Sequence, residues 1–587
     1  MTTDEKRRRF LACFSSMGLG ATLLPGVLWA QVQDAPAITA EMLKSALALS
    51  GLSFSEEEQK AMLQAANQNL GRYESVRNLK IPNDVSPPFH FSAIVPGMKV
   101  NRTREPLHFS KPLVKRPANL EAVAFWPVTE LARLVQTRQV TSMELTQMYL
   151  ARLHKHNEKL NCVVTFLDDH AMKQAKQADA EIAAGKYKGP LHGIPWGAKD
   201  IIAVPGYTTT WGSAAYRDQV LDEEASVVEM LREAGAVLLA KLASGELAQG
   251  DRWFGGQTKN PWNTAEGSSG SSAGPGSATA AGLVGFAIGT ETSGSILSPS
   301  ARCGVTGLRP TFGRISRYGV MALSWTQDRL GPMCRYAEDC AVVMSVIARP
   351  DNRDMSVSDI PFNWNAALNV RKLRVGILKD AFSDTRDPAL KKNDDATIAT
   401  LQGMGVELIP VTVPDWTLDT SNFSVESGAF FDELVRSGRY KQMTNPGRAN
   451  GFRSSRLIPA VDYLQSQRAR MMMMMKLAEA TSGVDVYLAP ANGGGGAAPA
   501  AGTPGDAPTE TAPNAQTPRR QSAAQRHSNM ANAACYPALN VPNGFTARGT
   551  PSSMTFFARP FCEGELLALG KAYQDVAGFH RKQPELG

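Results

Sequence analysis

Apolar residues recur at helical spacing in the first part of the chain. Between residues 38 and 81, two amphipathic stretches follow one another, and Thr39 and Ser55 stand before them as typical helix-capping residues. A proline-rich stretch then extends to Pro96. Because this segment is too small to fold alone, we predict a helical arm and linker over residues 31–116 that packs on a larger body.

From residue 117 onward, helix and strand patterns alternate. Helical spacing runs through residues 128–151 and 225–235, whereas the apolar run 236–242 predicts a buried strand. Residues 189–203 predict a loop and a strand, and the chain closes with a helical pattern around 566–580. This alternation predicts an α/β domain over residues 117–587, with a sheet covered by helices on both faces.

Two glycine-rich regions differ in their apolar content. Residues 262–298 contain the apolar run 283–288, which predicts glycine-rich loops around a buried strand where backbone comes close to a ligand. Residues 492–525 contain almost no large apolar residue, which predicts a disordered insertion. The run Met471–Met475 lies in a helical pattern and is interpreted as core filler.

The N-terminus has the three zones of an export signal. Basic residues at positions 6–9 precede a weakly apolar run that ends at Ala30, and Arg7-Arg8-x-Phe10-Leu11 resembles a twin-arginine signal. We predict a signal peptide over residues 1–30 and a periplasmic or secreted protein. The alternative is a retained basic anchor, against which Pro25 and the short apolar run argue.

Charge and cysteine usage exclude several classes of function. The net charge of +7 is partly local to the N-terminus. The sequence contains no basic stripe interleaved with aromatic residues, so we do not predict nucleic-acid binding. None of the seven cysteines stands in a CxxC pair or at zinc-ligand spacing from a histidine, so we predict no metal and no cofactor. Cys334 and Cys340 could form a disulfide, but buried free thiols are the favoured interpretation.

The histidines offer no conventional base for a serine nucleophile. None of the eight stands in a G-x-S-x-G or H-E-x-x-H context. A serine nucleophile would therefore need another base, and a lysine that burial keeps neutral near pH 7 can serve.

Several motifs, in order along the chain, resemble the amidase signature family. Residues 189–200 (GPLHGIPWGAKD) resemble its lysine segment, and residues 289–296 (GTETSGSI) resemble its nucleophile loop. The remaining matches are Asn260-Pro261-Trp262, the serine-rich loop 269–274, residues 303–316, 328–339, 536–542 and 558–561. The resemblance covers roughly residues 117–580 outside the insertion, and it implies the amidase signature fold with a large mixed β-sheet.

The resemblance also implies a mechanism and its residues. Lys199 would be the base, Ser271 a bridging serine that follows a cis peptide bond, and Ser295 the nucleophile that cleaves a carboxamide through an acyl-enzyme. The remaining implied roles are oxyanion donors at the backbone N–H groups of Thr292, Ser293, Gly294 and Ser295, orienting groups at Asp200, Ser272 and Glu291, a packing role for His192 and a core thiol at Cys303.

The sequence departs from the family pattern at positions that carry no reacting atom. Ser269-Gly270 and Ser293-Gly294 stand where the family usually has Gly-Gly, and Pro275 stands where a serine is common. Leu297 replaces an arginine that often follows the nucleophile by two residues, so no role for that arginine is carried over.

The substrate stays open at this stage. Tyr207, Trp211, Trp253, Phe254 and Trp325 flank the motifs and either line an acyl pocket or pack in the core. We predict an exported serine amidohydrolase that acts on a linear small-molecule or peptide amide, without nucleic acid or a stable membrane span. The alternatives are a non-catalytic exported binding protein and a tRNA-dependent amidotransferase subunit, and the predicted signal argues against the second of these.

Overall fold

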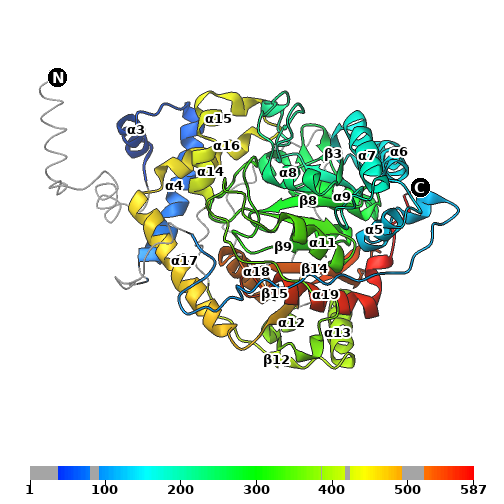
Figure 1. Cartoon of the computed structure of the whole chain (residues 1–587). Helices are drawn as coiled ribbons and strands as arrows, with labels where there is room; N and C mark the ends of the chain where they lie inside the picture. Colours follow the sequence, from blue (N-terminus) through cyan, green and yellow to red (C-terminus); the bar gives the residue numbers. More distant parts are fainter. Residues whose placement is uncertain are drawn as a thin grey trace, which may run out of the picture. The chain divides into compact units, whose positions relative to one another are not determined.

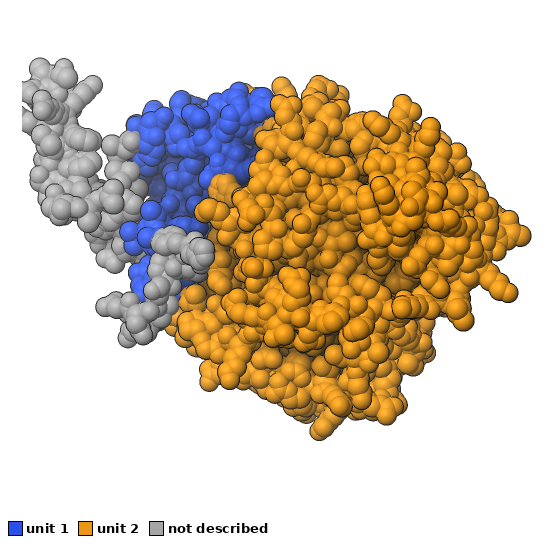
Figure 2. Space-filling view, in the orientation of Figure 1, with its two compact units in different colours: residues 1–87, 418–440, 446–469 blue, residues 88–417, 441–445, 470–587 orange. Residues whose placement is uncertain are grey.

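The computed structural model describes residues 38–77, 79, 91–384, 387–416, 423–491 and 521–586 (Figure 1). The predicted signal peptide and residues 492–520 of the predicted insertion lie outside this range. The chain divides into two compact units, which Figure 2 colours separately. In the described part of the chain, no helix combines the length and the apolar character that crossing a membrane requires.

The larger unit is built on an 11-stranded mixed sheet, as predicted. Its strands, in spatial order, are β1 (Val163–Phe166), β3 (Val237–Leu242), β2 (Pro195–Lys199), β8 (Phe286–Glu291), β10 (Arg329–Cys334), β9 (Thr306–Arg309), β14 (Ala538–Phe545), β15 (Pro551–Ala558), β13 (Val486–Pro490), β11 (Val375–Ile377) and β12 (Leu408–Pro410). The strands β3, β2 and β8 run parallel to one another, and so do β13, β11 and β12, whereas the pairs between them are antiparallel.

Helices pack against this sheet or against the helices that cover it (Figure 1). They are α5 (Val128–Gln136), α6 (Ser142–Leu160), α7 (Asp168–Ala183), α8 (Ser226–Glu233), α9 (Ala273–Ala280), α10 (Leu297–Cys303), α11 (Ala337–Ile347), α12 (Lys379–Ser383), α13 (Pro388–Gly403), α18 (Ala523–Ala533) and α19 (Glu563–Ala577). The predicted helix at 225–235, the strand at 236–242 and the C-terminal helix therefore correspond to α8, β3 and α19.

The helical pattern over residues 128–151 belongs to two helices, α5 and α6, rather than one. The break falls where Arg138 has a positive φ of 56°. Thr141 then caps α6, accepting from the N–H of Glu144 while the Glu144 carboxylate accepts from the N–H of Thr141. This reciprocal capping starts a new helix inside an apolar pattern that looked continuous.

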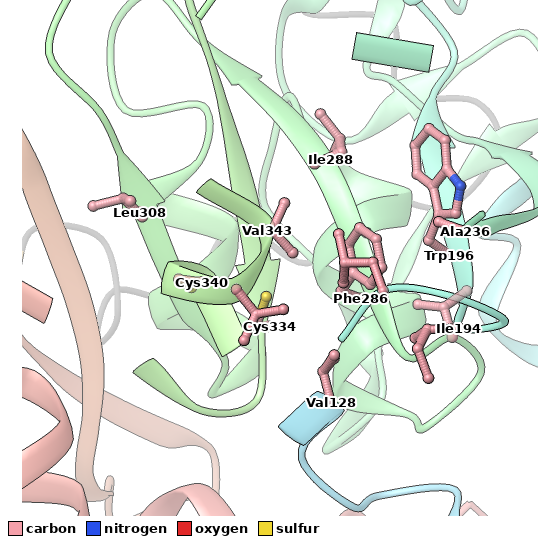
Figure 3. Close-up of a cluster of buried hydrophobic side chains, with 14 of the residues drawn as sticks. Val128, Ile194, Trp196, Ala236, Phe286, Ile288, Leu308, Cys334, Cys340 and Val343 are labelled. Carbon is pink, nitrogen blue, oxygen red and sulfur yellow. The ribbon is translucent and has the colours of Figure 1, made fainter. Parts of the chain in front are cut away.

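The core of the larger unit lies between the sheet and its helices (Figure 3). Trp196 of β2 and Phe286 of β8 stack with their ring centroids 5.9 Å apart. Cys334 and Cys340 are buried free thiols in this core, which agrees with the favoured interpretation. Burial of this apolar surface is the main force that holds the parallel strands β2 and β8 side by side.

The smaller unit contains part of the predicted arm and a distant stretch of chain. Its helices are α3 (Ala40–Leu49), α4 (Glu56–Arg77), α14 (Phe423–Phe430), α15 (Asp432–Arg436) and α16 (Ala449–Ser454), and the long helix α17 (Ala460–Ala480) begins within it. Thr39 and Ser55 cap α3 and α4, as predicted. Arg453 pairs with Glu58 at 3.2 Å and so ties α16 to α4.

Residues of the predicted arm and linker belong to both units. Helices α3 and α4 lie in the smaller unit together with α14, α15 and α16, while Phe91, Ala93 and Val95 are buried within the larger unit. The insertion predicted to run to 525 ends sooner, because Ser522 caps α18 by accepting from the N–H of Gln525. Apolar contacts made far along the chain place Phe91, Ala93 and Val95 in the larger unit, and local composition does not record such contacts.

Candidate active site

The predicted site residues gather at one end of two adjacent strands. Lys199 is the last residue of β2, and Glu291 is the last residue of the neighbouring parallel strand β8. Because parallel strands end at the same edge of a sheet, the segment after β8 lies next to Lys199. Ser271 directly precedes the N-cap of α9, and Ser295 directly precedes that of α10.

Lys199 is fully buried, and its side-chain nitrogen is surrounded by hydroxyl groups. Its Nζ lies 2.8 Å from Ser271 Oγ and 2.8 Å from Thr290 Oγ1. Burial lowers the pKa of Lys199 to about 7, against the opposing effect of the carboxylates of Asp328 and Glu291. At neutral pH a large fraction of this amine is therefore uncharged and able to accept a proton.

The serine-rich loop brings Ser271 and Ser272 against the other segments of the site. The Gly270–Ser271 peptide bond is cis. The N–H of Ser272 donates to the carbonyl of Ser295 at 3.1 Å, which joins the two serine loops directly. The Ser272 hydroxyl also donates to the carbonyl of Thr290 and accepts from its N–H, both at 3.1 Å. Ser272 therefore ties the end of β8 to the start of α9.

The Glu291 carboxylate holds the turn that contains Ser295. It accepts from the N–H groups of Ile296 at 2.8 Å and Leu297 at 2.9 Å, and it pairs with Arg309 Nη1 at 2.9 Å. Burial alone would raise the pKa of Glu291, but Arg309 and Arg329 hold it below its ordinary value. The carboxylate is therefore charged and fixes the backbone next to Ser295.

The turn itself leaves several peptide N–H groups unused. Gly294 has a φ of +83°, which favours glycine at this position. In the described part of the chain, the N–H groups of Ser293, Gly294 and Ser295 donate to no protein acceptor. Thr292 is anchored by its hydroxyl, which donates to the half-buried Asp328 carboxylate. Burial raises the pKa of Asp328.

Asp200 has its side-chain partners in β3 and in the loop that follows β2. Its carboxylate pairs with the buried amine of Lys241 at 2.8 Å and accepts from the hydroxyl and the N–H of Thr210. Lys241 also donates to Thr209 Oγ1 at 2.9 Å. Asp200 therefore braces the backbone beside β2 and β3, rather than touching Ser271 or Ser295.

Several residues at the site were not found from the sequence. Thr290 and Asp328 lie within the matched motifs, which was the only signal for them, whereas Lys241 lies outside every matched motif. Asn532 and Arg329 also reach the Ser295 turn; Arg329 lies within the matched residues 328–339, whereas Asn532 lies outside the matched motifs.

His192 and Cys303 have packing roles, whereas the aromatic candidates still allow both the acyl-pocket and the core-packing interpretation. His192 is buried, accepts from the N–H of Lys188 through Nδ1 and lies beside Glu181, as expected for a packing residue. Cys303 is buried, and burial raises the pKa of its thiol. Of the aromatic candidates, Trp253 is buried whereas Trp325 is 47% exposed.

Comparison with known proteins places these features in a family. The sequence profile of the amidase family, described as Amidase, matches residues 144–567. The chain is 33% identical to one component of the glutamyl-tRNA(Gln) amidotransferase of Methylococcus capsulatus, over 78% of this chain and 98% of the relative. It is 34% identical to AmiD of Mycobacterium bovis, whose name as an amidase is itself provisional, over 79% of this chain and 97% of the relative.

A solved structure agrees with this assignment. The native peptide amidase of Stenotrophomonas maltophilia superposes with a TM-score of 0.65 and 26% identity, covering 79% of this chain and 99% of that one. The fold and the family match define an amide-hydrolysing class of enzyme. The chain belongs to the amidase family, in its amidase signature group.

Proposed function

We propose that this protein hydrolyses a linear carboxamide by serine catalysis through Lys199, Ser271 and Ser295. The observation that carries the proposal is the contact between Lys199 Nζ and Ser271 Oγ at 2.8 Å, at an amine whose pKa lies at about 7. An uncharged amine in contact with a serine hydroxyl is the arrangement that a proton relay requires.

The reaction has two halves. Neutral Lys199 accepts the Ser271 proton while Ser271 accepts the proton of Ser295, and the Ser295 oxygen attacks the amide carbonyl. The C–N bond then breaks, the proton returns through Ser271 to the leaving amine, and an ester on Ser295 remains. Water attacks this ester along the same proton path, which releases the carboxylic acid and restores the three side chains.

The oxyanion that forms during both attacks needs hydrogen-bond donors. The N–H groups of Ser293, Gly294 and Ser295 support this role, because they have no protein acceptor in the described part of the chain. The N–H of Thr292 is the fourth predicted donor. Removing a single oxyanion donor typically slows an enzyme by about 10²–10³-fold.

A role as one component of an amidotransferase is the second candidate function. It is favoured by the 33% identity to the amidotransferase relative, over nearly the whole of that protein. Such a component would act with cytosolic partners. Co-purification of the untagged chain from its own cells decides between the two: stable partner proteins would favour the amidotransferase, and an amidase is expected to purify without them.

Export is a further part of the proposal and rests on residues 1–30. Intact-mass analysis of the mature protein should give an N-terminus at Gln31, and replacing both Arg7 and Arg8 with lysine should keep the chain in the cytoplasm. An uncleaved leader, or export that is unaffected by the double substitution, would count against a twin-arginine signal.

The catalytic proposal is tested by amide turnover of matched variants. Wild-type protein is screened against a library of peptide, aryl and aliphatic amides, and Ser295→Ala, Ser271→Ala and Lys199→Ala are assayed on any amide that is cleaved. Each variant should lose at least about 10³-fold in kcat. Ser277→Ala is the control, because the Ser277 hydroxyl donates to the carbonyl of Lys259 and should not affect turnover. Full activity of Ser295→Ala would refute the proposal.

A further inference from the structure

The carbonyl of Thr292 is held by side chains from two distant segments. Asn532, in α18, donates to it through Nδ2 at 2.7 Å, and Arg329, in β10, donates to it through Nη2 at 3.3 Å. Both side chains are buried. Thr292 lies in the turn between Glu291 and Ser295, so an anchor at its carbonyl acts on the backbone of the proposed oxyanion hole.

The amide group of Asn532 can adopt only one orientation. Its Oδ1 accepts from Arg329 Nη2 at 2.7 Å and from Arg309 Nη1 at 3.1 Å. Reversing the amide would bring its NH₂ group against two guanidinium groups and its oxygen against the carbonyl of Thr292. The two arginines therefore direct Nδ2 toward Thr292.

The backbone of α18 is also fixed next to Asn532. Arg470 donates through Nε to the carbonyl of Ala533 at 2.8 Å, and Arg309 donates to the carbonyl of Tyr536 at 3.0 Å. The Arg309 guanidinium also binds Glu291, which holds the other end of the turn. One buried network therefore fixes the turn from both ends.

Peptide geometry transmits this anchor to the site. The C=O and N–H groups of a trans peptide lie in one plane and point in opposite directions. With the carbonyl of Thr292 held on the buried side by Asn532, the N–H of Ser293 in the same peptide must point the other way. Ser293 is exposed, so this other side is open.

We infer that Asn532 is a positioning residue that orients the N–H of Ser293 as an oxyanion donor. This inference rests on the function proposed above. Asn532 touches no reacting atom and acts only through the Thr292–Ser293 peptide. Without its donor group the peptide is free to rotate, and the N–H of Ser293 no longer points at the developing negative charge.

The substitution that isolates this role is Asn532→Asp. The aspartate keeps the size of the side chain and the acceptor for Arg309 and Arg329, but it places an oxygen in place of Nδ2 against the carbonyl of Thr292. The matched control is Asn67→Asp in α4 of the smaller unit, because Asn67 also donates to backbone carbonyls through Nδ2, while its Oδ1 accepts from the N–H of Ile38.

The assay is the rate of serine phosphonylation by a fluorophosphonate probe, measured from pH 5 to 10 on the full-length protein. This reaction also builds negative charge on an oxygen that the oxyanion donors stabilise. We expect Asn532→Asp and the uncharged Asn532→Ser both to lower the plateau rate by about 10²-fold, and the pH midpoint of Asn532→Ser to stay near the Lys199 pKa of about 7. Asn67→Asp should react like wild type.

The midpoint is compared in Asn532→Ser, because the carboxylate of Asn532→Asp would itself favour protonated Lys199. A purely structural role would shift the midpoint of Asn532→Ser, because it would disturb the surroundings of Lys199. If wild type is labelled at Ser295 and Asn532→Asp reaches the same plateau rate as wild type, this inference is overturned while the proposed function stands. Wild-type protein without label at Ser295 would overturn the proposed function, and this inference with it. If Asn532→Asp does not fold, Asn532→Ser replaces it, because its hydroxyl is too short to reach the Thr292 carbonyl and the same loss is expected.

Discussion

Replacing Lys199 with methionine should abolish catalysis and yet stabilise the fold over part of the pH range. Methionine has a similar length and no charge, so it removes the buried amine without leaving a large cavity. In the described part of the chain, no carboxylate forms an ion pair with Lys199. Its protonated form is therefore unfavourable in the folded state.

The size of the effect follows from the pKa. A pKa of about 7, against the ordinary 10.5, means that burying the protonated form costs about 5 kcal/mol at or below pH 7. The unfolded chain binds this proton more tightly, so wild-type stability rises as the pH rises from about 7 toward 10.5. Methionine removes this cost and loses hydrogen bonds to Ser271 and Thr290, at about 1 kcal/mol each.

Urea denaturation of wild type and Lys199→Met from pH 6 to 10 measures the difference. The variant should be more stable by about 3 kcal/mol at pH 6, and the gap should close near pH 9. A gap that does not change with pH would refute the reasoning, because the pKa of Lys199 would then be the same in the folded and unfolded states.

Lys241→Met is the matched control. Lys241 is as fully buried as Lys199 and lies on the neighbouring strand, but it pairs with Asp200 at 2.8 Å. Removing its charge leaves a buried carboxylate without its partner, which should destabilise the fold by about 3–5 kcal/mol. The two methionine variants should therefore change stability in opposite directions at pH 6.

Three further outcomes are expected. Glu291→Gln removes the charge that pairs with Arg309, so it should lower the free energy of unfolding by about 3 kcal/mol and lower kcat at least tenfold. Unchanged thermal unfolding would contradict this. Gly235→Ala should lower the melting temperature by several degrees, because Gly235 has a φ of +81° and a Cβ there would lie 2.2 Å from His192 Cδ2. Burial lowers the pKa of His527 to about 3, so wild type loses stability as the pH falls from about 6.5 to 3 and His527→Phe should resist acid unfolding better. Identical acid midpoints for the two proteins would argue against this.

The sequence allowed the fold class and the lysine segment to be predicted because both depend on local patterns. Apolar runs at 236–242 and around 283–288 indicated β3 and β8, and the motif ending at Asp200 identified β2. The prediction that the segments containing Lys199 and Ser271 come together also agrees with their contact at 2.8 Å. The strands and the lysine motif each lie within a short stretch of chain, whereas the contact between Lys199 and Ser271 spans 72 positions and was expected from the family resemblance.

Other features depend on contacts between distant residues. The smaller unit adds residues 446–469 to the N-terminal helices, and Asn532 reaches Thr292 across 240 positions of sequence. Neither contact leaves a periodic signal. Asp200 directly follows Lys199 in sequence, but adjacent residues in an extended chain point to opposite faces, and the Asp200 carboxylate pairs with Lys241.

The central claim is that Ser295 forms the covalent intermediate while Lys199 acts as the base. The most direct test is to treat the protein with a fluorophosphonate at pH 8 and to locate the adduct by mass spectrometry of its peptides. The account predicts one adduct, on Ser295, and its loss in both Ser295→Ala and Lys199→Ala. An adduct on another residue, or labelling of Lys199→Ala at the wild-type rate, would contradict the account.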